Sequence, residues 1–89
     1  MQINPREVTK QEFNNMEMNN KTALVISGGE LIDERVIYGK YHIKMYSMRH
    51  FFVEVWIDVK KVEVEKIRAI ESEADWSGYL DSIRISDLN

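Results

Sequence analysis

Cysteine is absent from the 89-residue sequence, which excludes disulfide bonds, thiolate metal ligands and a cysteine nucleophile. Proline occurs once, and the sequence contains no repeat and no low-complexity segment. No apolar run approaches the roughly 20 residues that a membrane-spanning helix needs. The N-terminus lacks the basic and then apolar regions of a signal peptide. We therefore expect a cytoplasmic protein without a membrane partner.

An excess of positive charge is also lacking. Twelve Lys and Arg against 15 Asp and Glu give a formal net charge of −3, whereas proteins that bind the phosphate backbone usually carry an excess of basic residues. The basic residues in the middle of the chain are interleaved with acidic ones, which is typical of a solvated mixed surface. The sequence therefore disfavours a general nucleic-acid binder.

The residues that are present describe an ordinary globular protein. Hydrophobic residues make up 44% of the chain and charged residues 30%, a composition that separates it from disordered sequences. A chain of 89 residues has length for a single core, so we expect one domain spanning residues 1–89.

The segment 51–59 is the clearest structural signal. Its odd-numbered residues are Phe, Val, Val, Ile and Val, and its even-numbered residues are Phe, Glu, Trp and Asp. Alternation with a period of two is typical of a strand, because successive side chains point to opposite faces of a sheet. This pattern predicts a central strand whose odd-numbered face is buried beneath the helices.

Residues 31–38 and 41–47 predict a hairpin that precedes the central strand. Gly39-Lys40 fits a two-residue type II′ turn, since glycine accepts positive φ at the first central position. With Tyr38 opposite Tyr41, the apolar side chains of the two strands share one face. The next pairing stays open, because Lys44 opposite either Glu54 or Trp56 keeps the apolar faces aligned.

A fourth strand is predicted over residues 62–70. Val62 and Val64 share one parity, whereas Ile67 and Ala69 have the other. A β-bulge near Glu65-Lys66 would bring all four onto one face by inserting one residue.

Helices are predicted at both ends of the chain. In the N-terminal segment, Asn4 can cap a helix that has Pro5 in its first turn. Residues 22–27 read as helix or strand; helix is favoured, because they continue an apolar stripe that ends at Gly28-Gly29. Near the C-terminus, residues 72–75 resemble a capping box, and apolar residues follow at helical spacing: Trp76, Tyr79, Leu80 and Ile83. The predicted fold is thus α+β, a four-stranded antiparallel meander sheet with an N-terminal helix and a C-terminal helix.

Four motifs in this order resemble a group of small bacterial proteins of about 80–100 residues. They are Ile43-Lys44-Met45-Tyr46, Phe52-Val53-Glu54-Val55-Trp56, Val64-Glu65-Lys66-Ile67-Arg68 and Tyr79-Leu80. The group carries the pattern "LY-x-L…F(Y/F)VEVW…EIVKIRSF…YL", which covers roughly residues 20–88 here. The resemblance implies the α+β fold. The group has no assigned function, so the resemblance implies no catalytic or binding residue.

The sequence contains few residues that could catalyse a reaction or bind a metal. His42, Glu54 and Asp58, with Tyr46 beside them, could converge on one face of the sheet as a small enzyme site, a ligand site or a metal site. No glycine-rich phosphate loop, nucleophile elbow or known catalytic spacing accompanies them. We therefore assign no catalytic, cofactor-binding or metal-binding residue and keep this site as the alternative hypothesis.

Phe52 and Trp56 are either covered by one of the helices or the N-terminal segment, or they form an exposed aromatic patch for binding. Both lie on the side of the central strand that carries Glu54, and aromatic residues rimmed by charge are typical of interfaces. The preferred hypothesis is a protein-interaction module, either a homodimer or the partner of another protein, that uses a sheet face or a strand edge. Nucleic-acid binding by aromatic stacking is the third hypothesis. The candidate interaction surface consists of Phe52, Trp56, Glu54, Lys44, Tyr46 and Arg68.

Overall fold

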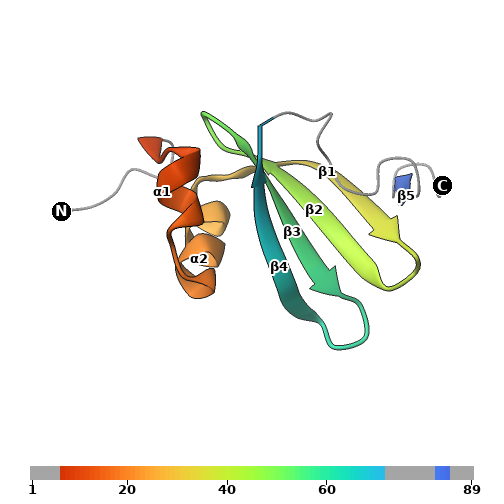
Figure 1. Ribbon diagram of the computed structural model, residues 1–89. Coiled ribbons are helices and arrows are strands. Elements are labelled where there is room, and N and C mark those ends of the chain that lie inside the picture. Colours follow the sequence, from red (N-terminus) through yellow and green to blue (C-terminus); the bar gives the residue numbers. More distant parts are fainter. Residues whose placement is uncertain (1–6, 72–81, 85–89) are drawn as a thin grey trace.

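A computed structural model describes residues 7–71 and 82–84 of the chain, as two helices followed by an antiparallel sheet (Figure 1). The sheet has the strand order β4-β3-β2-β1-β5. The elements are α1 (Lys10–Asn14), α2 (Met18–Gly28), β1 (Glu30–Ile37), β2 (Tyr41–Ser47), β3 (Phe52–Asp58), β4 (Glu63–Ile70) and β5 (Ser82–Arg84). The expected four-stranded meander with helices is therefore present as β1 to β4.

The N-terminal helical segment is divided into two helices. A capping box begins α1: the Thr9 hydroxyl accepts a hydrogen bond from the Glu12 backbone N–H at 3.1 Å, and the Glu12 carboxylate accepts one from the Thr9 N–H at 3.1 Å. The helix over residues 22–27 is confirmed as part of α2, which ends at Gly28. Asn4 and Pro5 lie outside the described residues.

The central strand is confirmed as β3. Phe51, Val53 and Val55 are buried against α1 and α2, and they form one core with Phe13 and Val25 of these helices. The Phe13 and Phe51 rings lie 5.4 Å apart in a tilted arrangement. Phe51, Val53 and Val55 therefore face inward beneath the helices, whereas Ile57 is half-buried and Val59 is exposed in the turn after β3. We call this side of the sheet the helix face.

The predicted turn between β1 and β2 is wrong by one residue. Ile37, rather than Tyr38, stands opposite Tyr41, and the Lys40 N–H donates to the Ile37 carbonyl at 3.0 Å. Tyr38 and Gly39 both have positive φ, 55° and 65°, which is the pattern of a type I′ turn and not of type II′. The shift reverses the faces of β1, so that Arg35 and Ile37 are buried and Tyr38 is exposed.

Neither register considered for β2 and β3 occurs. Lys44 pairs with Val55, and Ile43 pairs with Trp56. The apolar residues of β2 consequently lie on the side of the sheet that carries the even-numbered residues of β3, which we call the opposite face. This face has a second core of Ile37, Ile43, Met45 and Ile70, with Tyr41, Phe52 and Trp56 packed against it.

The β-bulge predicted in the last long strand is confirmed, but Val62 lies in the turn before β4, with a φ of 55°, and is exposed rather than on the strand's apolar face. Trp56 pairs with Lys66 and the next residue of β3, Ile57, pairs with Val64, so Glu65 is the inserted residue. Val64 and Ile67 consequently both point to the helix face despite their different parity.

The predicted C-terminal helix falls mainly outside the described residues, including Ser72, Trp76, Tyr79 and Leu80. The described part, Ser82–Arg84, is strand β5, which pairs antiparallel with the last residues of β1. Ile83 therefore lies in a strand and not in a helix. None of the helices in the described ranges is long and apolar enough to cross a membrane.

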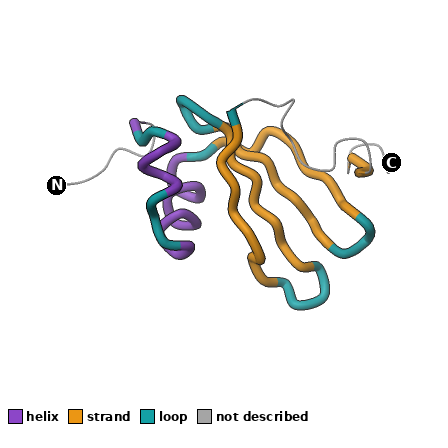
Figure 2. The backbone as a smooth tube through the Cα atoms, in the orientation of Figure 1, coloured by secondary structure: helices purple, strands orange, loops and turns teal. Residues whose placement is uncertain are grey.

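The helices cover only part of the helix face. They lie together near one end of the sheet, and both hairpin turns at the other end extend past them (Figure 2). Because α1 has 5 residues and α2 has 11, they cannot span strands of seven and eight residues over their whole length.

Candidate functional site: an apolar cleft beside helix α2

The partly covered helix face contains a cleft of about 130 Å³ between α2 and the sheet. Its wall on the helix side consists of Thr22, Val25 and Ile26, and its wall on the sheet side consists of Lys44, Tyr46, Val55, Ile57 and Val64. Most of these side chains are apolar, and they come from one helix and three adjacent strands. The cleft is therefore a product of the tertiary fold and not of a local motif.

Two apolar side chains at the cleft are open to solvent. Ile26 is 74% exposed on α2, and Val64 is 37% exposed on β4. Single exposed apolar residues are common on proteins. Exposed apolar residues that border a partly buried apolar cleft, as Ile26 and Val64 do here, are typical of a contact surface.

Lys44 and Tyr46 are the polar side chains of the sheet wall. They lie two residues apart on β2, so both point to the helix face, about 7 Å apart along the strand. Within the described residues, neither the Lys44 ammonium nor the Tyr46 hydroxyl has a hydrogen-bond or ion-pair partner. Glu34 stands opposite Lys44 in the register, but its carboxylate contacts His42 Nε2 at 3.0 Å.

The opposite face carries a buried polar cluster around Glu54. Glu54 is 0% exposed. Its Oε1 accepts a hydrogen bond from Trp56 Nε1 at 3.0 Å and lies 3.2 Å from Arg68 Nε. Glu54 and Arg68 stand directly opposite each other on β3 and β4. This pairing compensates a carboxylate that would otherwise be costly to bury.

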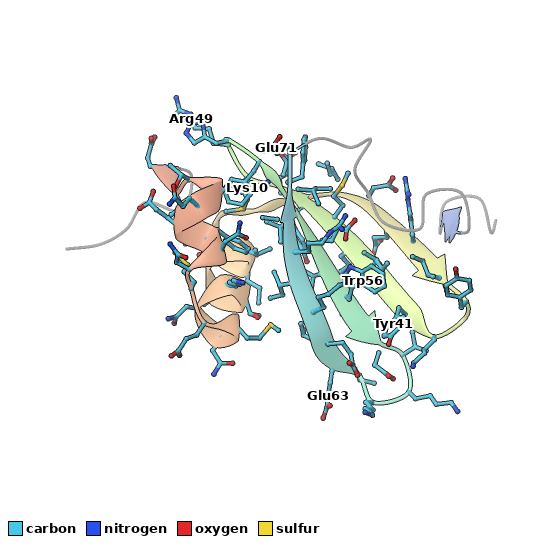
Figure 3. All side chains as sticks on the ribbon, in the orientation of Figure 1. Lys10, Tyr41, Arg49, Trp56, Glu63 and Glu71 are labelled. Carbon is cyan, nitrogen blue, oxygen red and sulfur yellow. The ribbon has the colours of Figure 1, made fainter. Side chains whose placement is uncertain are left out.

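The Trp56 ring on this face is already in contact with protein groups. Lys66 Nζ lies 4.2 Å from its centroid, and the Tyr41 ring packs against it edge-on at a centroid distance of 5.4 Å (Figure 3). A nucleic-acid base would have to displace Lys66 to stack there, so no observation favours the nucleic-acid hypothesis.

The structure divides the candidate interaction surface between the two faces. Phe52, Trp56, Glu54 and Arg68 belong to the opposite face, where Glu54 is buried and the other three are half-buried; Lys44 and Tyr46 line the cleft on the helix face. The six residues therefore do not form one continuous surface. The one-residue difference in register between β2 and β3 is the physical cause.

The same register separates the residues of the alternative site. His42 pairs with Ile57 and lies on the helix face, whereas Glu54 and Asp58 lie on the opposite face. The expected convergence of these three side chains is therefore wrong. No group of three potential metal ligands was found in residues 7–71.

Asp58 has a local structural role at the turn after β3. Its Oδ1 accepts hydrogen bonds from the backbone N–H groups of Lys60 at 2.9 Å and Lys61 at 3.0 Å. The Lys61 N–H, followed by the Lys60 N–H and the charges of Lys61 and Lys40, lowers the pKa of the Asp58 carboxyl, against a smaller opposing effect of its burial. The carboxylate form therefore stabilises the turn.

A second depression, of about 440 Å³, lies beside α1 and the end of β4. It is lined by Lys10, Arg68, Ala69, Ile70 and Glu71. The Lys10 ammonium contacts the Glu71 carboxylate at 3.3 Å (Figure 3), and Arg68 is paired with Glu54. Because the charged side chains that line this depression are already paired with each other or with Glu54, it is a weaker candidate for a binding site than the cleft.

The helix side of the cleft was not predicted from the sequence. Ile26 was the available signal. It is a large β-branched residue that lies outside the helical stripe of the predicted helix, which consists of Ala23, Leu24 and Ser27. A large apolar residue on the polar side of a short helix is a reason to look for an interface.

The chain was compared with known families and proteins. No family model matches it, and neither a curated protein nor a solved structure matches it.

Proposed function

We propose that this protein is a small interaction module that binds a polypeptide, either a second copy of itself or another protein, in the cleft beside α2. The observation that carries the proposal is the continuous apolar lining from Ile26 across Ile57 to Val64, which the two short helices leave accessible. Apolar area of this kind gains free energy when a partner removes it from water, at about 25 cal/mol per Å².

The size of the cleft supports a side-chain anchor over a small-molecule substrate. Small-molecule sites usually have volumes of roughly 300–1,000 Å³. The cleft has about 130 Å³, which suits one large apolar side chain of a partner rather than a whole ligand. Interfaces often concentrate their binding energy in such anchor pockets.

Strand-edge pairing is a less favourable route to association. The outer edge of β4 carries the Glu65 bulge and the charged residues Glu63, Glu65 and Lys66. Bulges and charges on an edge strand oppose pairing with another chain. A sheet-face cleft is therefore preferred over the edge as the contact site.

Two further expectations are retained as proposals. Membership in the group of small bacterial proteins rests on the four sequence motifs, of which three lie on β2, β3 and β4. A cytoplasmic location rests on the sequence alone.

The proposal is tested with a random peptide library and with light scattering. Ile26→Lys places a charge at the mouth of the cleft, and Tyr38→Lys is the matched control, since Tyr38 is 79% exposed in the β1–β2 turn and Ile26 is 74% exposed. We expect peptides selected on the natural protein, or a dimer seen by light scattering, to be lost in the Ile26 variant and retained in the control. A strictly monomeric protein that enriches no cleft-dependent peptide would contradict the proposal.

A further inference from the structure

The inference concerns the chemistry of the partner and rests on the proposed function. The sheet wall of the cleft places an ammonium and a phenol hydroxyl, those of Lys44 and Tyr46, next to an apolar surface. Both groups can donate hydrogen bonds, and the ammonium forms no ion pair with a described residue. No carboxylate lines the cleft. Its polar wall therefore complements an anion.

We propose that the cleft recognises a polypeptide segment in which an apolar anchor side chain is adjacent to an Asp or Glu, with the carboxylate bound by Lys44 and Tyr46. The apolar anchor enters between α2 and β4, against Ile26, Ile57 and Val64. The carboxylate then lies over β2, where the Lys44 ammonium and the Tyr46 hydroxyl, on residues whose Cα atoms are about 7 Å apart along the strand, can each donate to one of its oxygens.

The position of Lys44 explains why it should favour a partner with a carboxylate at this place. Lys44 is half-buried, and its cross-strand neighbour Glu34 is engaged by His42. A cation beside an apolar wall is less hydrated than one on an open surface, so its attraction for a carboxylate is less screened. A basic or amide side chain at the same place would leave the ammonium without compensation.

A second copy of this chain is the less suitable occupant. Two copies that face each other across a two-fold axis at the cleft would bring two Lys44 side chains toward the same region, and like charges disfavour such contacts. A fatty acid shares the required chemistry, but a cleft of about 130 Å³ is small for a long alkyl chain. The occupant inferred is therefore an acidic and apolar segment of a different protein.

The test uses peptides selected from the random library on the natural protein. We expect the selected sequences to share an apolar residue with an Asp or Glu beside it. Replacing that acid by its amide in the best-binding synthetic peptide should weaken binding about five- to tenfold, which is the range for a hydrogen-bonded charge that is partly screened. Lys44→Met retains the apolar stem and should abolish the difference between the acid and amide peptides without abolishing binding.

A charge reversal and a matched control complete the test. Selection on Lys44→Glu should enrich Lys or Arg beside the anchor, whereas Lys61→Met, which changes an exposed lysine in the β3–β4 turn, should leave the acid preference unchanged. Binding by apolar peptides without an acid preference would overturn this inference and leave the proposed function standing. A cleft-dependent homodimer would do the same, and the absence of any cleft-dependent binding would remove both.

Discussion

The buried Glu54 carboxylate provides a sharp test of the register between β3 and β4. Its side chain is 0% exposed, and the Arg68 side chain beside it is 39% exposed. Arg68→Met removes the guanidinium and keeps an apolar stem against the sheet. We expect this variant to be markedly less stable, because it leaves a buried negative charge with fewer compensating groups.

The expected magnitude follows from the two exposures. Breaking a fully buried ion pair costs about 3–5 kcal/mol. Since solvent reaches part of Arg68, a loss of about 2–3 kcal/mol is expected here. Glu54→Gln removes the charge and keeps an acceptor for Trp56 Nε1, so it should cost about 1–2 kcal/mol. The double variant should cost less than the sum, because no buried charge remains to be compensated.

Urea unfolding followed by circular dichroism measures these differences. With a slope near 1 kcal/mol per M for a small domain, the Arg68→Met midpoint should fall by about 2–3 M. Lys61→Met is the control, since the Lys61–Glu65 pair is exposed with a separation of 3.9 Å and should contribute less than about 0.5 kcal/mol.

Two results would refute the reasoning. Additive effects in the double variant would mean that Glu54 and Arg68 do not act on each other. An Arg68→Met loss as small as that of Lys61→Met would mean that Glu54 is compensated by other groups, and that the β3–β4 pairing does not depend on this contact.

Three further variants test the turns and the end of helix α2. Asp58→Asn should reduce stability at neutral pH, because the folded-state pKa of Asp58 is lowered and its carboxylate stabilises the fold above the unfolded pKa of about 3.9. This stabilisation is lost as the pH falls through the folded-state pKa, so the thermal unfolding temperatures of the two proteins should converge in strong acid, and a constant difference across pH would contradict the prediction. Gly29→Ala should destabilise the protein by about 1–3 kcal/mol in urea, because its Cβ would lie 2.7 Å from the Val25 carbonyl oxygen although its φ of −87° suits alanine. Gly39→Ala meets no atom within 4 Å and should cost about 1–2 kcal/mol through its φ of 65° alone, and a harmless Gly29→Ala would show that the last turn of α2 can shift to relieve the contact.

Several elements were predictable because local physics decides them. The alternation over residues 51–59 requires an extended strand whose two sides differ in polarity. The conflict of parity between Val64 and Ile67 can be removed only by an extra residue, which is Glu65. Gly28-Gly29 correctly marked the end of the helix over residues 22–27, since glycine disfavours helix continuation.

The register between strands was not predictable in the same way. The prediction assumed a single apolar face, on which Val36, Ile43 and Val53 would meet. In the structure both faces are buried in part, so Ile43 packs on the opposite face while Val53 packs under the helices. When both faces can bury apolar residues, patterning no longer distinguishes a register from its one-residue slip.

The amino-acid sequence by itself determined which segments of β1 to β4 are extended, where the last of them bulges and where the helical segment ends, because each depends on neighbours in the chain. Only the tertiary structure decided which residues share a face. A one-residue difference in the register between β2 and β3 placed Lys44 and Tyr46 beside α2 and removed them from Trp56 and Glu54. The cleft exists because two short helices meet a longer sheet, and that relation is a property of the packed fold.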